Sequence, residues 1–569
     1  MTAAPAIFVL GPSALALALA VKAEIGGHVH GPRNLPGADR HFDHATAEIA
    51  RVFRNGRPLV GLCAAGILIR AIAPLLGDKR AEPPVVAVAE DGSAVIPLLG
   101  GHRGANDLAR RIAALTGGTA ALTTASDVVL GEALDAAHGA ILANPEHHKK
   151  AAAAMLRGEE VARETTIHRK AGSERHLVYH PLRLAVGLGC ERGADPSELR
   201  RLLDETLARH NIAAASIRHF GSIDLKEDEP AVTQFGDVVF FSAERLRQEE
   251  TRLATPSALV AKEVGVAGVA EASALALAGP EGRLIVPKVK GVRATLAIAE
   301  APDHWDFAGH GGRRRGHLAV VGIGPGSHDM LTPAAEHALW QAEDWVGYSL
   351  YLDLVDGLRQ KHQARHDFPL GDEEKRVRRA IELASQGRHV ALVCSGDAGI
   401  YAMASLAYEL IEREPSRIAV EVIPGISAFQ MASARAGALI GHDFCCISLS
   451  DLLTPWEEIE KRIAAAAAGD FVVAFYNPRS RKRIDQLARA MAILARHRPP
   501  ATPVIIASNL GRPEEKMRIV ALAEFNPEDV DMLTLVMVGA SQSRSFTRGD
   551  GRTSAYTPRG YARKREAAE

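Results

Sequence analysis

Three short glycine-containing loops in the C-terminal half constrain the fold of this 569-residue chain more than any other feature. Each loop follows an apolar, β-branched run and precedes a helical pattern, so each is predicted to be the turn from a strand to a helix. Ligands in open α/β sheets bind at such turns. We therefore expect this half to be an α/β enzyme that binds a small molecule. The loops are Gly322-Ile323-Gly324-Pro325-Gly326, Ser395-Gly396-Asp397-Ala398-Gly399 and Val422-Ile423-Pro424-Gly425-Ile426-Ser427.

The residues of these loops argue against a phosphate-binding site. A dinucleotide-binding fingerprint needs a third glycine at the position where this chain has Ser327. The chain also lacks the G-x-x-x-x-G-K-[ST] pattern of a nucleoside triphosphate site. Pro325 and Pro424 remove N–H donors that a phosphate would need. These features favour a ligand that is uncharged at the loops, and they leave a nicotinamide-dependent oxidoreductase as the less favoured alternative.

Charge and cysteine content exclude several classes of partner. Lysine and arginine together number 67 against 68 aspartates and glutamates, so the net charge of -1 gives no general attraction to nucleic acid or to an anionic membrane. The five cysteines show no C-x-x-C spacing, so neither a disulfide framework nor a metal site is expected.

The apolar start from Ala6 to Val21 lacks a basic region and contains Gly11-Pro12, which favours a strand and a helix over a signal peptide. No apolar stretch reaches the ~20 residues that span a bilayer. We expect a cytoplasmic protein.

The chain is long enough for several domains, because an ordinary domain has roughly 150 residues. Short apolar runs alternate with helical patterns on both sides of Pro302–Gly316, a segment rich in Gly and Arg with the composition of a linker. A helix from Ala151 to Arg163 is expected inside a more polar stretch. The predicted parts are an N-terminal α/β domain (1–145), a connecting segment (146–177), a second α/β domain (178–300), a linker (301–316), two α/β lobes (317–430 and 431–548) and a polar tail (549–569).

Further motifs in the C-terminal half resemble those of a known family. They are Gly347-Tyr348-x-x-Tyr351, Cys394-Ser395-Gly396-Asp397-Ala398-Gly399-Ile400-Tyr401 and Phe475-Tyr476-Asn477-Pro478. Together with the glycine loops they resemble the tetrapyrrole (corrin and porphyrin) methylases, and within them the precorrin-3B C(17)-methyltransferase branch of cobalamin biosynthesis. The resemblance runs from about Gly316 to Phe546. The chain departs from the family at Ala398, where proline is usual, and at Ser327, where an acid is common.

This resemblance implies a methyl donor, S-adenosyl-L-methionine, bound between two α/β lobes of a homodimer. It also implies methylation of precorrin-3B at carbon 17 of ring D, with contraction of the ring to give precorrin-4. A sulfonium donor is already activated, so alignment of the reacting atoms supplies most of the catalysis. The implied donor-binding residues are Gly324, Pro325, Gly326, Ser395, Gly396, Asp397, Ile400, Gly425, Ile426, Ser427, Ala428, Tyr476 and Asn477.

Ring contraction needs a proton transfer, and the substrate carries many carboxylates. Asp397, Tyr348 and Tyr401 are candidates for the general acid or base by residue type and loop position. Cations should pair with the carboxylates, and the candidates are Arg435, Arg479 and Arg481. The expected partners are the tetrapyrrole substrate and other enzymes of the corrin pathway, with no nucleic acid and no membrane. Whether the substrate carries cobalt stays open.

The N-terminal half resembles a second family of the same pathway. Gly61-Leu62-Cys63-Ala64-Ala65-Gly66 and Gly187-Leu188-Gly189-Cys190-Glu191-Arg192-Gly193 are among its matching stretches, which fall within Gly61–Asp127 and Leu184–Ala299. They resemble the cobalt-precorrin-5A hydrolases, which open a lactone and release a two-carbon fragment. Lactone opening needs an activated water and an acid for the leaving oxygen. A non-catalytic docking or channelling module is the alternative. Candidate residues by chemical type are His102, Lys226, Glu227, Glu271 and Lys288.

Overall fold

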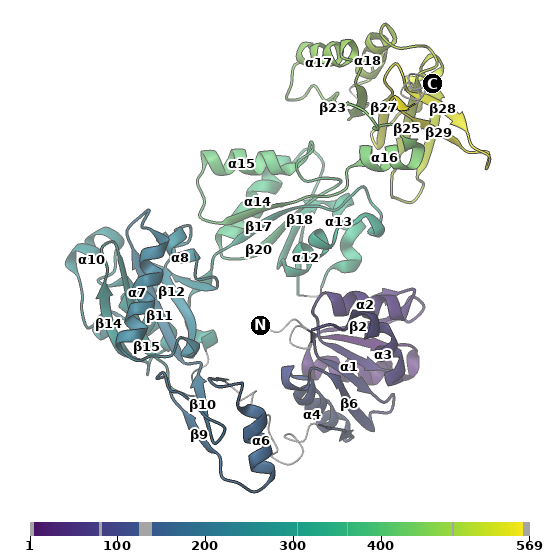
Figure 1. Ribbon diagram of the computed structural model, residues 1–569. Coiled ribbons are helices and arrows are strands. Elements are labelled where there is room, and N and C mark those ends of the chain that lie inside the picture. The colour runs from purple at the N-terminus through teal and green to yellow at the C-terminus, as the bar shows by residue number, and fades with distance from the viewer. Residues whose placement is uncertain are drawn as a thin grey trace. The chain divides into compact units, whose positions relative to one another are not determined.

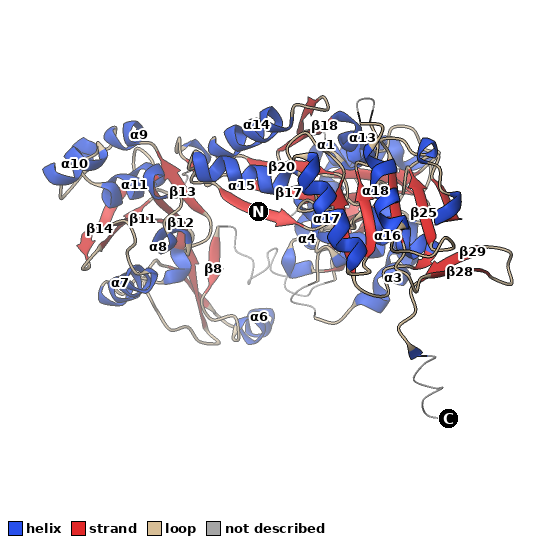
Figure 2. Ribbon diagram, turned by 90° about the horizontal axis from the view of Figure 1, so that it is seen from above, coloured by secondary structure: helices blue, strands red, loops and turns tan. Residues whose placement is uncertain are grey.

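The computed structural model describes residues 5–78, 82–123, 139–303, 305, 307–360, 362–480 and 483–561 (Figure 1). The chain divides into two compact units, Met1–Gly312 (unit 1) and Arg313–Glu569 (unit 2), and the division falls inside the predicted linker. Helices alternate with strands in both units (Figure 2). The α/β class predicted for both halves is therefore confirmed.

Unit 1 begins with a mostly parallel sheet whose strand order is β3-β2-β1-β4-β5-β6-β7. Strand β1 is an interior strand of this sheet, between β2 and β4, and it is fully buried because its Ala6-Ile7-Phe8-Val9 sequence is apolar on both faces. Only β6 pairs antiparallel, with β5, among the described strands of this sheet. The elements are β1 (Ala6–Val9), α1 (Leu15–Ile25), β2 (His28–Pro32), β3 (Arg40–Phe42), α2 (Ala45–Arg54), β4 (Leu59–Leu62), α3 (Ala65–Ile72), β5 (Val85–Val88), β6 (Ala94–Leu99), α4 (Ala105–Thr116) and β7 (Thr119–Ala120).

The connecting segment of unit 1 forms a small sheet of its own, in the order β8-β10-β9. The helix predicted from Ala151 to Arg163 is shorter than expected and ends at Leu156. Its end is set by Gly158, whose φ of 81° lies in the left-handed region that glycine adopts easily. Residues 162–163 belong to a strand instead. The elements are β8 (Ala140–Leu142), α6 (His148–Leu156), β9 (Ala162–Thr165) and β10 (His176–Pro181).

The last part of unit 1 is a sheet in which β11 lies between β12, a parallel neighbour, and β15, an antiparallel one. Helix α11 packs on β11 so closely that a Cβ on Gly187 would lie 1.8 Å from the carbonyl oxygen of Ala270. The predicted helix cap at Asp195 is confirmed, because its side chain accepts a hydrogen bond from the Ser197 N–H. The elements are β11 (Leu184–Cys190), α7 (Pro196–Arg209), β12 (Ile217–Ile223), α8 (Pro230–Thr233), β13 (Val238–Phe241), α9 (Ala243–Arg247), α10 (Ala258–Val264), α11 (Val269–Ala278), β14 (Arg283–Lys290) and β15 (Ala294–Glu300).

Unit 2 contains a parallel sheet, lobe 1, with the strand order β19-β18-β20-β17-β21. Gly322 at the end of β17 is in register with Cys394 of β20, and Val321 is in register with Ile423 of β21. The three glycine loops therefore leave the same edge of the sheet from three neighbouring strands. The elements are β17 (His317–Gly322), α12 (Pro333–Gln341), β18 (Asp344–Tyr348), α13 (Ser349–Val355), β19 (Ala364–Phe368), α14 (Glu373–Ser385), β20 (His389–Cys394), α15 (Met403–Arg413) and β21 (Ala419–Ile423).

A mixed sheet in the order β23-β24-β27-β25-β26, together with the β22-β29-β28 sheet, forms lobe 2. The buried face of α16 packs against it through Phe429 and Met431. Strand β29 lies within the segment predicted to be a polar tail. The elements are α16 (Ala428–Ala436), β22 (Gly437–Ala438), β23 (Phe444–Ser448), α17 (Trp456–Ala468), β24 (Val472–Tyr476), α18 (Gln486–Ala495), β25 (Pro503–Ser508), β26 (Lys516–Ala521), β27 (Thr534–Val538), β28 (Arg544–Thr547) and β29 (Thr553–Tyr556).

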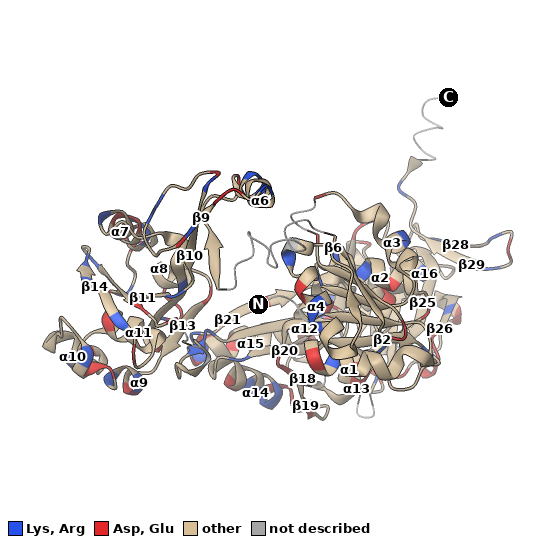
Figure 3. Ribbon diagram, turned by 90° about the horizontal axis from the view of Figure 1, so that it is seen from below, with Lys and Arg blue, Asp and Glu red and all other residues tan. Residues whose placement is uncertain are grey.

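Charged residues of both signs are interspersed over the ribbons of both units (Figure 3). None of the helices in the described ranges combines the length and the apolar character that crossing a membrane requires.

Candidate functional site

The three glycine loops of lobe 1 touch one another through their backbones. Gly324 and Gly396 exchange hydrogen bonds, with N···O distances of 3.1 Å and 2.7 Å. A Cβ on Gly425 would lie 2.1 Å from the carbonyl oxygen of Gly396 and 2.6 Å from that of Gly322. Atoms at these distances clash, so only glycine fits there. The edge of the sheet is thus a surface made of closely packed backbone.

Asp397 ties the second loop to the third. Its Oδ1 accepts a hydrogen bond from the Gly399 N–H at 2.8 Å, and its Oδ2 accepts one from the Gly425 N–H at 3.1 Å. The neighbouring Ala398 is fully buried. One carboxylate oxygen therefore braces the second loop itself, and the other links it to the third loop.

The third loop leads directly into α16 through a helix cap. Ser427 is the N-cap residue, and a capping box joins it to Gln430, whose Oε1 accepts a hydrogen bond from the Ser427 N–H at 2.9 Å. Ser427 is buried. Ile426 and Ala428 flank this cap, so the predicted donor-binding residues of the third loop lie at the start of a helix.

Two aromatic residues bring the ends of strands in lobe 2 next to the second loop. The Tyr401 hydroxyl donates a hydrogen bond to the carbonyl oxygen of Cys446 at 2.8 Å, and the rings of Tyr401 and Tyr476 have centroids 5.3 Å apart. Asn477 donates from Nδ2 to the Ser448 hydroxyl at 3.1 Å. Burial raises the pKa of the Tyr476 hydroxyl. Tyr401 has a φ of 51° and Asn477 a φ of 49°, and left-handed backbone at non-glycine residues often marks functional sites.

An arginine that the sequence did not single out links the two lobes at the first loop. Arg512, in the segment between β25 and β26, donates from Nε to the carbonyl oxygen of Pro325 at 3.2 Å and from Nη2 to the Ser395 hydroxyl at 3.1 Å. Its guanidinium carbon lies 5.9 Å from the ring centre of Tyr351. Burial lowers the pKa of Arg512 and raises the pKa of Tyr351.

Tyr348, another predicted residue, belongs to the same group. Its ring meets that of Tyr351 edge to face, with centroids 5.1 Å apart. The guanidinium carbon of Arg376 lies 6.0 Å from the Tyr348 ring centre. Arg376 is buried and was also missed by the sequence analysis. A row of Arg512, Tyr351, Tyr348 and Arg376 therefore lines the end of β18.

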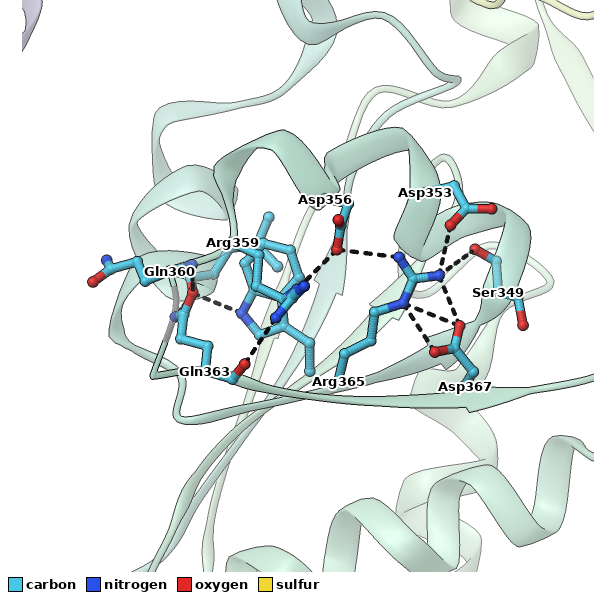
Figure 4. A network of polar contacts seen from close by, with 10 residues as sticks. Ser349, Asp353, Asp356, Arg359, Gln360, Gln363, Arg365 and Asp367 are labelled. Atoms are coloured by element: carbon cyan, nitrogen blue, oxygen red, sulfur yellow. Dashed lines mark hydrogen bonds and ion pairs between the residues drawn. The ribbon is translucent and has the colours of Figure 1, made fainter. Parts of the chain in front are cut away.

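Helix α13, which carries Tyr351, is held to the edge strand β19 by Arg365 (Figure 4). The guanidinium of Arg365 pairs with three carboxylates and also donates to the carbonyl oxygen of Ser349. These hydrogen bonds raise the pKa of Arg365 above its usual value. The network fixes the helix beside the glycine loops. The nearest N···O distances are 2.6 Å to Asp353, 3.1 Å to Asp356 and 2.7 Å to Asp367.

The three arginines predicted to bind substrate have different surroundings. Arg435 is half exposed, and its Nε lies 3.5 Å from Glu515. Arg479 pairs with Glu528 at 2.7 Å and also donates to the carbonyl oxygen of Pro527. Arg481 lies outside the described residues. Both described arginines thus already have a carboxylate partner.

A second polar group lies at the ends of β11 and β12 in unit 1, with the buried Glu229 at its centre. Its Oε1 accepts a hydrogen bond from the Gly193 N–H at 3.0 Å. Its Oε2 has no hydrogen-bond donor among the described residues, although Nη1 of Arg192 lies 3.4 Å away and Nζ of Lys226 3.9 Å away. Cys190 ends β11, and burial raises the pKa of its thiol to about 11. Lys226 was predicted from the sequence, whereas Glu229 was not.

Two other hydrolase candidates, Glu271 and Lys288, have hydrogen-bond partners of their own. Glu271 is buried and accepts four hydrogen bonds: three from the N–H groups of Ala254, Thr255 and Lys288, and one from the Thr255 hydroxyl. Burial alone would favour the neutral carboxyl, but these hydrogen bonds lower its pKa. Lys288 donates from Nζ to the carbonyl oxygen of Thr255 at 2.6 Å. The pair therefore anchors the segment before α10.

The remaining hydrolase candidates are Glu227 and His102. Glu227 is buried beside Lys226, at the end of the short helical turn Asp224–Lys226. His102 lies in the turn Gly101–Arg103, and its side chain is outside the described part of the structure.

Unit 2 also has a small cavity of about 120 Å³, lined by His317, His389 and Glu421 among others, at the opposite end of β17 from the glycine loops.

The loops, lobes and motifs described above agree with comparisons of the whole chain with known families. Residues 317–526 match the tetrapyrrole (corrin/porphyrin) methylases, residues 47–127 match the cobalamin synthesis G N-terminal family, and residues 184–299 match the cobalamin synthesis G C-terminus family. The chain belongs to the tetrapyrrole methylase family, fused to a cobalamin synthesis G-like N-terminal half. The resemblances predicted for both halves are confirmed.

Individual relatives are named for cobalamin biosynthesis. The chain is 44% identical over 259 residues to the cobalamin biosynthesis protein CobIJ of Mycobacterium tuberculosis, covering 44% of this chain and 50% of that protein. It is 43% identical over 254 residues to the cobalt-factor III methyltransferase of Priestia megaterium, covering 44% and 46%. It is 38% identical over 250 residues to the precorrin-3B C(17)-methyltransferase of a Sinorhizobium species, covering 43% and 98%. The chain thus spans about half the length of the first two relatives.

Proposed function

We propose that unit 2 transfers a methyl group from S-adenosyl-L-methionine to carbon 17 in ring D of precorrin-3B, with ring contraction to precorrin-4. The observation that carries the proposal is the mutual backbone packing of Gly322, Gly396 and Gly425 at three neighbouring strand ends, in a chain of the tetrapyrrole methylase family. Relatives named as C(17)-methyltransferases support the choice of carbon.

The strand-end loops suit the donor because glycine leaves their backbone groups uncovered by side chains. Gly324, Gly396 and the start of α16 at Ile426 are the positions we assign to holding it, with the half-buried Tyr476 beside them. When bound, the donor supplies a methyl group on a positively charged sulfur, which needs no further activation. The task of the protein is then to keep the methyl group and the ring carbon in line, and rigid loops tied by Asp397 serve that task.

The proton transfer of ring contraction is assigned to Tyr348 among the three sequence candidates. Both oxygens of Asp397 accept backbone hydrogen bonds, and the Tyr401 hydroxyl donates to Cys446, so these two side chains have positioning roles. No residue in the described ranges hydrogen-bonds the Tyr348 hydroxyl, whose ring is held by Tyr351 and faces Arg376. A phenol beside a guanidinium suits general acid chemistry, because the cation stabilises the phenolate that forms.

The same methyl transfer on the cobalt-bearing substrate is the alternative. It is supported by the cobalamin synthesis G-like unit 1 and by the relative named cobalt-factor III methyltransferase. The loops and the arginine–tyrosine row are compatible with either substrate.

The test uses the purified full chain, without oxygen, and S-adenosyl-L-methionine labelled in its methyl group. The chain is incubated in parallel with metal-free precorrin-3B and with its cobalt counterpart, and label in the extracted tetrapyrrole is counted. We expect label in at least one reaction and none without tetrapyrrole. A faster reaction with the cobalt-bearing substrate would favour the alternative, and no label from either would contradict methyl transfer.

A second activity, lactone hydrolysis, is proposed for unit 1 on the geometry of Glu229. A carboxylate with one oxygen held by Gly193 and the other beside two cations is suited to take a proton from water. The water oxygen would bond to the lactone carbonyl carbon as Glu229 takes the proton. The bond from that carbon to the ring oxygen would then break, and the departing oxygen would take a proton from Lys226.

This second proposal is tested by incubating the full chain with cobalt-precorrin-5A and following the mass of the tetrapyrrole. Lactone opening by itself predicts a gain in mass of one water. If the freed hydroxyl then loses its proton and the neighbouring C–C bond breaks, a two-carbon carbonyl fragment leaves, the macrocycle takes up the electron pair and a proton, and the net mass falls. An unchanged mass, in a preparation that still transfers methyl groups, would favour the docking or channelling role for unit 1.

A further inference from the structure

Arg512 is a half-buried cation with no counter-ion among the residues that the structure describes. Two of its nitrogens donate to uncharged oxygens, those of Pro325 and Ser395, and no carboxylate in the described residues pairs with it. The buried or half-buried arginines Arg479, Arg483 and Arg498 of the same lobe each have a carboxylate within 4 Å. A charge that has lost part of its hydration without gaining an opposite charge is unfavourable unless a ligand supplies one.

The surrounding backbone is shaped to hold Arg512 in this place. A Cβ on Gly326 would lie 2.5 Å from Cγ of Arg512, so the first loop has a glycine where the arginine stem passes. A Cβ on Gly511 would lie 2.9 Å from the nitrogen of Ser327. Glu515, a carboxylate of the same segment, accepts a hydrogen bond from the Gly511 N–H at 2.8 Å and faces Arg435. It therefore supports the segment without neutralising Arg512.

A second cation, for which the described ranges supply no carboxylate partner, lies at the other end of the tyrosine pair. Arg376 is only 3% exposed, and its Nε has no hydrogen-bond partner among the described residues. Its other nitrogens contact the carbonyl oxygen of Pro369 and the sulfur of Met403. The row from Arg512 to Arg376 therefore presents two uncompensated positive charges and two phenols beside the glycine loops.

We propose that Arg512 binds a carboxylate side chain of the tetrapyrrole, with Arg376 adding to the positive potential of the same subsite. This proposal rests on the proposed function of unit 2. A tetrapyrrole with several acetate and propionate groups fits two such cations better than the methyl donor does. The donor carries an ammonium next to its single carboxylate, and the two guanidiniums would repel that ammonium.

The test measures binding of two stable porphyrins to the full chain by fluorescence, uroporphyrin as the octacarboxylate and coproporphyrin as the tetracarboxylate. Arg512→Gln should weaken uroporphyrin binding about 10- to 100-fold, the effect of losing a charged hydrogen-bond donor. Arg512→Lys should fall between this variant and the native chain. The matched control is Arg518→Gln, because Arg518 is an exposed arginine on β26 that pairs with Asp529 at 2.6 Å. It should change binding less than about twofold.

Calorimetry with S-adenosyl-L-methionine identifies the source of the carboxylate. The proposal expects Arg512→Gln to bind the donor as the native chain does. Weaker donor binding with unchanged porphyrin binding would assign Arg512 to the donor and overturn the proposal. Equal porphyrin binding by Arg512→Gln and the native chain would overturn it as well.

The salt dependence of porphyrin binding and the KM for the tetrapyrrole are two further measurements of the subsite. If Arg512→Gln does not fold, the native chain decides: its preference for uroporphyrin over coproporphyrin should shrink as salt screens the charge, and a salt-independent preference would refute the subsite. Methyl transfer with an unchanged KM for the tetrapyrrole in Arg512→Gln would reject the subsite and keep the proposed function. Arg512-dependent porphyrin binding without any methyl transfer would keep the subsite and reject the proposed function.

Discussion

The site in unit 2 and the polar group in unit 1 both lie at the ends of strands, but backbone groups form the first and side chains form the second. In unit 2 the centre is backbone, where a side chain on Gly322 or Gly425 would clash with the carbonyl oxygen of Gly396. In unit 1 the centre is the side chain of Glu229, with Arg192 and Lys226 beside it. Each construction fits its proposed chemistry, because methyl transfer depends on alignment and hydrolysis depends on moving protons.

This contrast predicts that opposite kinds of substitution inactivate the two sites. Adding one methyl group should break the backbone-built site, while removing one charge should leave most of it in place. In the side-chain-built group of unit 1, removing one charge should abolish most of the activity. For Glu229, the methyl transfer activity of unit 2 therefore serves as an internal control.

The largest effect is expected from Gly425→Ala. The new Cβ would clash with the carbonyl oxygens of Gly396 and Gly322, so the loops must move apart. A displacement of about 1 Å is enough to lower kcat/KM for methyl transfer roughly 100-fold or more. The matched control is Gly357→Ala, because apart from its neighbours in the chain no atom of the described residues lies within 4 Å of the Cβ position there. Near-native methyl transfer by a folded Gly425→Ala variant would contradict the backbone account.

Glu229→Gln should have the next largest effect, on hydrolysis alone. The amide keeps the size of the side chain but no longer accepts a proton, so the rate of cobalt-precorrin-5A opening should fall about 100-fold. Methyl transfer by the same preparation should stay within about twofold of native. Both rates can be followed by mass spectrometry. Equal loss of both activities would show that the variant disturbs the whole fold and would contradict two separate sites.

Asp397→Asn should have a smaller effect, of about tenfold on kcat/KM for methyl transfer. The amide retains one acceptor for the Gly399 or Gly425 N–H and turns a donor toward the other, which weakens the link between two loops. Because we assign Asp397 a positioning role, the pH dependence of kcat should keep its native shape. Loss of one limb of the profile would make Asp397 the proton-transfer group instead.

Local patterns explain what could be predicted from the sequence. The three loops follow β-branched runs, so their place at strand ends could be predicted, and parallel pairing then brings them to one edge. The cap at Asp195 is equally local. By contrast, Arg512 meets Pro325 across 187 residues of sequence, and no periodicity encodes such a contact. Glu229 was missed because Lys226 and Glu227 are as polar as it is, and only folding buries it.

The most direct test of the central claim is where the methyl group goes. The full chain is supplied with S-adenosyl-L-methionine carrying a carbon-13 methyl group, together with the tetrapyrrole that proves to be its substrate. The product is then examined by carbon-13 NMR. We predict one enriched methyl signal on carbon 17 of a contracted ring. Enrichment at another ring carbon, or methylation without contraction, would contradict the account.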